Sequence, residues 1–277
     1  MCKTDAMRFL RRQPWASVPH AALASVVGVL TDIDDTLTTG GAITPDALDA
    51  LARLKAAGLP VIAVTGRSMG WSRPFALAWP LDAIVAENGA IALFREAGGL
   101  TTEYAQDAAT RARNAVRLDE VAQRVLRAVP GSRLAGDSPG RVTDIAIDHA
   151  EFARLDATQV RDIVGLLREE GLHASVSSIH INGWIGAHNK LSGARWIVQR
   201  RLGRDLDKEM GRWIYVGDSS NDQLMFEHFP LGVGVANLMR FAAELRCWPA
   251  YLTGAERGAG FTEVADAVLA AQHAARR

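Results

Sequence analysis

The sequence predicts an α/β protein, with a doubly wound, Rossmann-like parallel sheet as its core and a smaller α+β domain inserted into it. Three observations predict this class. Short apolar segments, typical of buried strands, alternate with amphipathic helical segments in the first and last thirds of the chain. The alternation stops in the middle of the chain and later resumes. Polar residues follow the apolar segments directly, where such a sheet places its ligands.

The first apolar segment ends in a cluster of acids. Residues 26–31 lead directly into Asp32, Asp34 and Asp35. Side chains two positions apart on an extended chain lie on the same face, so Asp32 and Asp34 can converge on one point. Two carboxylates about 4 Å apart repel by roughly 4 kcal/mol at an effective dielectric near 20. A hard divalent cation would offset that repulsion; the alternative is an acidic loop without a chemical role.

The next segments continue the alternation. Residues 44–46 (Thr, Pro, Asp) open a helix with an N-cap hydroxyl, a proline in the first turn and an acid near the positive helix end, and Gly58 ends it. Residues 60–64 predict a second buried strand and residues 82–86 a third. Strand, helix, strand, helix, strand is the order of a doubly wound sheet.

The middle of the chain has a different pattern. Residues 105–129 and 155–170 predict helices, whereas residues 141–148 and 174–185 alternate polar and apolar and predict half-exposed strands. We expect these segments to form the insert around an antiparallel sheet. The expected limits give a core domain of residues 1–90 and 187–277 and an inserted domain of residues 91–186.

The first pattern then returns. Residues 189–202 predict a helix, and residues 213–216 predict a strand that ends in the polar segment 217–222. A strand at residues 231–235 and a helix at residues 262–272 complete the core.

Composition narrows the functional classes. The 277 residues are 48% hydrophobic and carry 31 basic against 31 acidic residues. Balanced charge gives no support to nucleic-acid or membrane-surface binding, and no apolar run is long enough to span a membrane. The two cysteines, Cys2 and Cys247, have no metal-ligand spacing and fit a reducing cytoplasm. We expect a cytoplasmic monomer or homodimer that acts on a small molecule.

Four polar groups at strand ends and helix starts fit the parts of a phosphoryl-transfer site. They are Asp32 with Asp34, Thr65 with Gly66, Lys190, and Asp218 with Asp222. A carboxylate such as Asp32 can attack phosphorus and carry the phosphoryl group, while Asp34 can exchange a proton with the leaving oxygen and the attacking water.

The other groups have complementary roles. Thr65 and the Gly66 amide suit phosphate oxygens, and Lys190 supplies positive charge to the transferring group. Asp218 and Asp222 can complete a Mg²⁺ site with Asp32.

These motifs resemble those of the haloacid dehalogenase superfamily, in the same order and over the whole chain. The motifs are segments 32–38, 64–67 and 217–222, together with Lys190. The insert resembles the superfamily's type IIB cap, found in Cof-like, sucrose-phosphate and mannosyl-phosphoglycerate phosphatases.

The resemblance implies roles for the motif residues. Asp32 would be the nucleophile, Asp34 the acid/base, Thr65 and Lys190 phosphate contacts, and Asp218 a magnesium ligand. The backbone carbonyl of Asp34 would also be a ligand, and Asn221 and Asp222 match supporting positions, which we assign to phosphate and metal respectively. One position departs from the pattern, because many members have glycine where this chain has Asp35.

Substrate choice is expected to come from the insert. Four polar residues near its strand ends are candidates: Arg141, His180, Asn182 and His188. Each of them can equally be a solvated or structurally bonded side chain. Asn88 reads as a turn residue, and Arg67 as either a substrate contact or a structural ion pair.

The leading hypothesis is a Mg²⁺-dependent phosphatase of a small phosphorylated metabolite, with a sugar phosphate as the first choice. A phosphomutase would use the same phosphoaspartate chemistry but return the group to a sugar. A non-catalytic regulatory module that holds phosphate on aspartate is the third reading, although it would need neither Asp34 nor a large insert.

Overall fold

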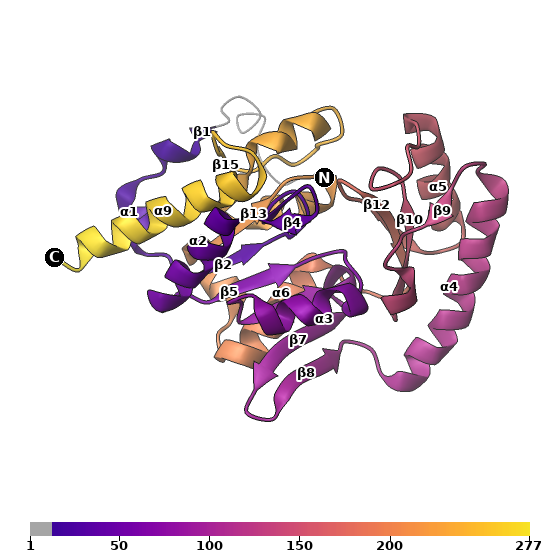
Figure 1. Cartoon of the computed structure of the whole chain (residues 1–277), viewed down its shortest axis with the longest axis horizontal. Coiled ribbons are helices and arrows are strands. Elements are labelled where there is room, and N and C mark those ends of the chain that lie inside the picture. Colours follow the sequence, from indigo (N-terminus) through magenta and orange to yellow (C-terminus); the bar gives the residue numbers. More distant parts are fainter. Residues whose placement is uncertain (1–12) are drawn as a thin grey trace.

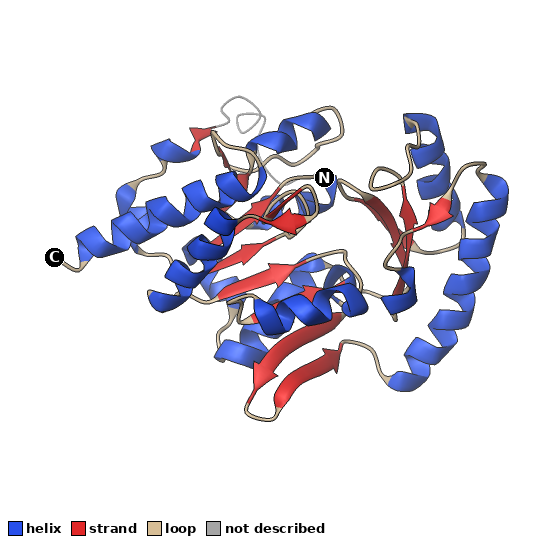
Figure 2. Cartoon of the chain, in the orientation of Figure 1, coloured by secondary structure: helices blue, strands red, loops and turns tan. Residues whose placement is uncertain are grey.

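The computed structural model describes residues 13–277. It consists of a larger and a smaller part, each built from a sheet and helices (Figure 1). A nine-stranded sheet forms the core, and a four-stranded sheet with the helices α4 (Ala108–Ala128) and α5 (Ala157–Glu169) lies beside it. Helices cover both faces of the larger sheet (Figure 2). The fold class expected from the sequence is therefore confirmed: a doubly wound core with an inserted α+β cap.

The strands of the larger sheet run in the order β1-β15-β14-β13-β2-β5-β6-β7-β8. The central strand β2 (Gly28–Thr31) pairs in parallel with β13 (Trp213–Gly217) on one side and β5 (Val61–Val64) on the other. All its residues are buried, as expected for a strand covered on both faces. The remaining strands are β1 (Gln13–Pro14), β6 (Ala83–Ala86), β7 (Ile91–Glu96), β8 (Gly99–Tyr104), β14 (Leu231–Gly234) and β15 (Tyr251–Leu252).

Alternate side chains of the central strands enter two different hydrophobic cores. Val29 of β2 packs into one core and Leu30 into the other, because successive side chains of a strand point to opposite faces. The first face is covered by α1 (His20–Ala24), α2 (Pro45–Ala56), α3 (Met69–Ala78) and α9 (Arg257–Ala275). The second face is covered by α6 (Lys190–Leu202), α7 (Leu206–Glu209) and α8 (Gln223–His228).

The cap has its own antiparallel sheet and its own core. Its strands run in the order β11-β12-β10-β9 and comprise β9 (Arg133–Leu134), β10 (Asp144–Asp148), β11 (His173–Val176) and β12 (His180–Trp184). Side chains of α4 and α5 such as Val125 and Leu167 pack against the sheet residues Ile147 and Ile181. Figure 1 places the cap next to the ends of the core strands, in the position of a lid over that edge.

Two expectations about the insert need correction. Residues 91–104 belong to the core sheet, because β7 pairs with β6 and β8 pairs with β7, so the expected domain limit at residue 91 is too early. The turn signal for this hairpin was the pair Gly98 and Gly99, the second with a positive φ of 120°. The expected strand at residues 174–185 is two strands, since an alternating pattern does not show where a chain reverses.

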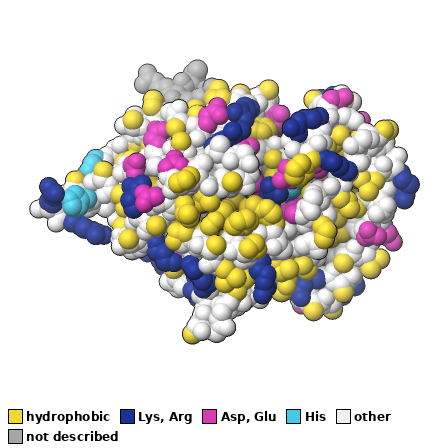
Figure 3. All heavy atoms as spheres, in the orientation of Figure 1, with side chains coloured by type: hydrophobic (Ala, Val, Ile, Leu, Met, Phe, Trp, Pro, Cys, Tyr) yellow, Lys and Arg dark blue, Asp and Glu magenta, His cyan; other side chains and the backbone are white. Residues whose placement is uncertain are grey.

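The surface agrees with the balanced composition. Figure 3 shows basic and acidic side chains interspersed on one face, with hydrophobic side chains gathered across its middle. No helix among residues 13–277 has both the length and the apolar character that a membrane crossing needs. Cys247 is partly exposed, whereas Cys2 and the first twelve residues of the expected core domain lie outside the described part.

Candidate active site at the carboxyl edge of the core sheet

The two acidic motifs are brought together by the pairing of their strands. Thr31 at the end of β2 lies opposite Val216 of β13, so Asp32 and Asp218 leave the sheet side by side. The Asp32 amide donates to the Val216 carbonyl at 2.8 Å, which continues the strand pairing into the motif. Parallel pairing thus joins two acids that are far apart in the sequence, at the edge where such sheets bind ligands.

Three carboxylates share this edge. Oxygen atoms of Asp32, Asp218 and Asp222 all lie within 4.8 Å of one another, and all three residues are buried. Burial raises the pKa of Asp32 to about 7 against the opposing effect of Lys190. Burial, with the neighbouring Asp32 and Asp222, raises the pKa of Asp218 well above its usual value. The three carboxylates are therefore not fully compensated by the positive charge around them.

Lys190 is the one cation that contacts this cluster among the described residues. Its Nζ lies 2.8 Å from Oδ1 of Asp32 and 2.7 Å from Oδ1 of Asp222. It is the first residue of α6, which begins at a capping box between Asn189 and Ser192. Since the helix start fixes its backbone, the buried ammonium group is held between the two carboxylates.

The carboxylates differ in how much hydrogen bonding they already have. Asp222 accepts from Lys190, from the hydroxyl of Tyr215, and from the amides of Asp218 at 2.9 Å and Ser219 at 3.1 Å. By contrast, Oδ1 of Asp218 is buried without a hydrogen-bond partner among residues 13–277. Asp32 and Asp218 therefore fit a hard divalent cation such as Mg²⁺, while Asp222 is placed to orient Lys190 and the loop.

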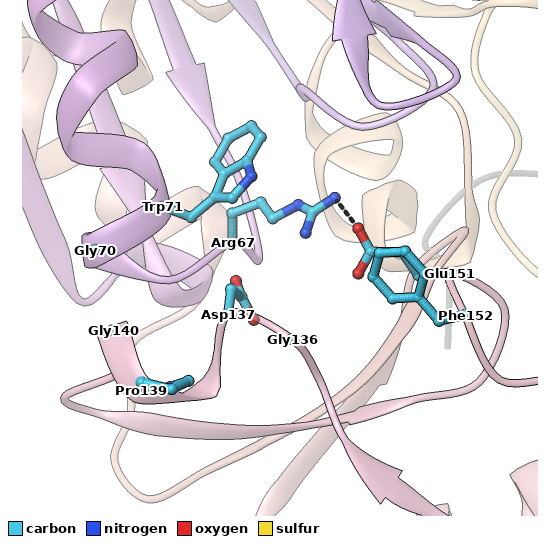
Figure 4. Close-up of a pocket in the computed structure, with 9 residues that line it drawn as sticks. All are labelled: Arg67, Gly70, Trp71, Gly136, Asp137, Pro139, Gly140, Glu151 and Phe152. Carbon is cyan, nitrogen blue, oxygen red and sulfur yellow. Dashed lines mark hydrogen bonds and ion pairs between the residues drawn. The ribbon is translucent and has the colours of Figure 1, made fainter.

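Asp34 lies outside this cluster, because its carboxylate is held by Arg67. The guanidinium donates from Nε to both carboxylate oxygens, at 3.0 and 2.9 Å, and from Nη2 to Oδ1 at 2.9 Å. Nη2 of Arg67 also reaches Oε1 of Glu151 in the cap at 2.8 Å (Figure 4). Of the two readings of Arg67, the structure thus shows the ion pair. The side chain of Asp34 is not one of the clustered acids, and its carbonyl stays the predicted ligand.

Thr65 and Gly66 follow β5 at the same edge. Thr65 is buried, and its hydroxyl accepts from the amide of Arg67 at 3.1 Å. The carbonyl of Gly66 accepts from Arg141 at 3.0 Å and from Asn182 at 3.2 Å, and both donors belong to the cap. The loop predicted to bind phosphate is therefore held in place by the cap.

The four candidate cap residues do different things. Arg141 is buried and forms ion pairs with Asp137 and Asp144, and Asn182 also donates to Asp144 at 3.1 Å. His180 bonds to Glu151 at 2.8 Å. Nε2 of His188 has no hydrogen-bond partner among the described residues, and burial lowers its pKa to about 4. Three of the four thus join parts of the cap to one another or to the core, and none of these contacts tests their predicted role toward substrate.

Comparisons with known proteins agree with this geometry. Residues 29–114 match the family model of the haloacid dehalogenase-like hydrolases. Over these residues the chain is similar to that family. A comparison of the sequence with curated proteins gives no match.

Several solved structures share the fold of this chain. A HAD/COF-like hydrolase of Plasmodium vivax is 17% identical with a TM-score of 0.65, covering 91% of this chain and 99% of its own. The sucrose-phosphatase of Synechocystis is 17% identical with a TM-score of 0.62, covering 88% and 98%. The trehalose-6-phosphate phosphatase C-terminal domain of C. albicans is 13% identical with a TM-score of 0.65, covering 94% and 98%.

Asp35, which stands where the resemblance led us to expect glycine, has a conformation suited to glycine. Asp35 has a φ of 52°, in the left-handed region that glycine adopts without strain and that aspartate tolerates better than most residues. Its carboxylate pairs with Arg257 at 2.9 Å, and its carbonyl accepts from Asn237 at 3.0 Å. Asp35 thus adopts a backbone conformation that glycine also adopts without strain.

Sequence reasoning missed the main anchor between the cap and the core. Glu87 is fully buried and accepts hydrogen bonds from the amides of Met69, Val142 and Thr143 and from the Thr143 hydroxyl, at 2.6 to 3.1 Å. Asn88, expected to be a turn residue, also donates to Asp144 at 3.2 Å. An acid between a buried strand and a glycine was the available signal, because such a position can bury a carboxylate only with many donors.

Proposed function

We propose that this hydrolase is a Mg²⁺-dependent phosphatase that acts on a small phosphorylated metabolite, with a sugar phosphate as the first choice. The observation that carries the proposal is the buried cluster of Asp32, Asp218 and Asp222. Its single ammonium group contacts Asp32 and Asp222, and one oxygen of Asp218 has no hydrogen-bond partner among residues 13–277. The names of two fold neighbours, a sucrose-phosphatase and a trehalose-6-phosphate phosphatase, support the substrate class.

In this proposal Asp32 is the nucleophile. Its carboxylate forms a bond to phosphorus as the bond to the leaving oxygen breaks, and water later cleaves the aspartyl phosphate. Lys190 orients the attacking carboxylate and offsets negative charge. Thr65 and the amide of Gly66 contact phosphate oxygens, and Asn221 contributes its side-chain amide. Bound Mg²⁺ would neutralise charge on the phosphoryl oxygens and relieve the repulsion between Asp32 and Asp218.

Asp34 is the proposed acid and base. Its carboxylate is held in place by the ion pair with Arg67, and a carboxylate in this position can take a proton from the attacking water. Protonation of the leaving oxygen by the same group requires Asp34 to move away from Arg67. Because Arg67 also bonds to Glu151, this movement would couple the acid to the cap. We further propose a cytoplasmic monomer or homodimer without nucleic-acid or membrane partners.

The test is phosphate release from a panel of sugar and other small phosphates, with Mg²⁺ and with chelator. We expect chelator-sensitive release that Asp32→Asn abolishes, while Asp49→Asn, an exposed change on α2, leaves it intact. Full release by Asp32→Asn would contradict the proposal. Transfer of labelled phosphate to sugar without inorganic phosphate would identify a phosphomutase instead.

A further inference from the structure

A cavity of about 550 Å³ lies between the cap and the core, next to the proposed phosphate site. Its cap wall comes from α5 and β11, and its core wall includes α8 and the turn before it. Lys190 and Asn221 line it, which joins the cavity to the carboxylate cluster through the contact of Lys190 with Asp32. This volume is within the range of about 300 to 1,000 Å³ that is usual for small-molecule sites.

Most charged side chains around this cavity are basic, and two of them form no ion pair within the described residues. Arg168 of the cap and Arg246 of the core both line it, and neither has an ion-pair partner within residues 13–277. His173 and the single acid Glu244 are also on its wall. Arg168 and Arg246 are exposed, unlike Arg67 and Arg141, whose buried guanidinium groups are paired with carboxylates. Two unpaired guanidinium groups from different domains are therefore available to a ligand.

Unpartnered polar atoms line the same cavity. The hydroxyl of Ser175 and Nδ2 of Asn221 are buried and have no hydrogen-bond partner among the described residues. Both can donate a hydrogen bond, as can the two guanidinium groups. Buried donors without partners are rare in folded proteins, so this wall is better suited to a ligand rich in acceptors than to an empty interior.

A second cavity between cap and core does not offer the same chemistry. It is lined by Arg67, Trp71, Asp137 and Glu151 among others (Figure 4). Neither Asp32 nor Lys190 lines it, and its one cation, Arg67, is already paired with Asp34 and Glu151. An anionic group would find no free positive charge there.

We propose that the cavity beside Lys190 binds the part of the substrate that is not transferred, and that this part carries a second anionic group, either a carboxylate or a phosphate, held by Arg168 and Arg246. The inference rests on the proposed phosphatase function and restricts its substrates to phosphate esters that carry a second anionic group. Guanidinium groups suit both anions because their donors match two oxygens at once. One arginine comes from each domain, so the second anion would also connect cap to core.

Steady-state kinetics with matched substrates tests the substrate class. The pairs are 3-phosphoglycerate with glycerol 3-phosphate, and fructose 1,6-bisphosphate with fructose 6-phosphate, which separate the carboxylate from the phosphate. In at least one pair, we expect the substrate with the additional anionic group to have a kcat/KM about tenfold higher than its partner without it. Arg168→Ala and Arg246→Ala should remove most of that preference through KM, while Arg161→Ala, on α5 but outside the cavity lining, should keep it.

Calorimetry separates this inference from the proposed function. With Mg²⁺ present, ω-carboxyalkylphosphonates of increasing chain length are compared with alkylphosphonates of equal length. Tighter binding of one carboxylated length, lost in Arg168→Ala, supports the second anion site even if no ester is hydrolysed. Equal binding of both series, together with equal kcat/KM within each substrate pair, overturns the inference while leaving phosphatase activity intact. An equal loss for charged and neutral compounds in Arg168→Ala also overturns it, since that would indicate cap packing.

Discussion

Lys190 and Asp32 form an ion pair of 2.8 Å in which the ammonium group is also shared with Asp222. All three side chains are buried. The attraction of the two acids raises the pKa of Lys190 despite the cost of burial. A single positive charge thus compensates carboxylates from two strands, and its loss would leave them to repel one another.

Lys190→Met should lower kcat by about a hundredfold or more, because the transition state loses a fixed positive charge. It should also lower the thermal stability in chelator, with part of that loss restored by Mg²⁺. Lys208→Met removes an exposed lysine and is the control. Activity within a factor of three of the unmodified protein would contradict the role of Lys190.

Arg67→Ala tests whether Arg67 positions Asp34. Substrates with a poor leaving group need a proton from Asp34, whereas p-nitrophenyl phosphate does not. We expect kcat for an alkyl phosphate to fall about tenfold more than kcat for p-nitrophenyl phosphate. Arg73→Ala, an exposed change on α3, should affect neither. Equal losses on both substrates would show that Arg67 acts only on the fold.

Glu151 should contribute to stability in a defined pH window. Its hydrogen bonds to His180 and Arg67 outweigh burial and lower its pKa from 4.5 to about 2. The folded state therefore binds its proton less readily than the unfolded state does. The contribution is fully present above about pH 4.5 and is lost as the pH falls toward 2.

We expect the free energy of unfolding to fall more steeply between pH 5 and 3 in the unmodified protein than in Glu151→Gln, by about 1 kcal/mol. Urea unfolding at several pH values measures this difference. The matched control is Glu227→Gln, for which no ion pair is found among residues 13–277. Parallel pH curves for Glu151→Gln and the unmodified protein would show that the ion pair adds no stability.

Gly70 and Gly140 place the cap against the core at backbone distance. A Cβ on Gly70 of α3 would lie 2.7 Å from Cα of Gly140, and one on Gly140 would lie 2.8 Å from Cα of Gly70. Either alanine substitution should lower stability by about 1 to 3 kcal/mol, since backbone must move apart. Gly98→Ala, with open space around its Cβ position, is the control for unfolding measurements. A cost near zero at both sites would mean that the contact opens readily.

Much of the core sheet could be predicted from the local pattern of apolar and polar residues. Apolar segments such as residues 60–64 and 82–86 have the composition of strands covered on both faces, and β5 and β6 were found there. The α+β character of the insert also followed from the sequence, where segments that alternate polar and apolar residues lie between helical segments. The hairpin of β7 and β8 was assigned to the wrong domain, because pairing with β6 is a long-range choice that residues 91–104 do not specify by themselves.

The sequence by itself determined the order of elements and the residue types at the strand ends, because burial and backbone preference act on neighbouring positions. It therefore identified Asp32, Lys190 and Asp218 as members of one edge. Only the tertiary structure decided what each side chain contacts. In the folded chain, Asp34 forms an ion pair with Arg67, and Asp222 forms one with Lys190. Arg141 and Asn182 both donate to the Gly66 carbonyl. Such contacts depend on which strands and loops meet in space, and hydrogen bonds in a buried site are set by that geometry.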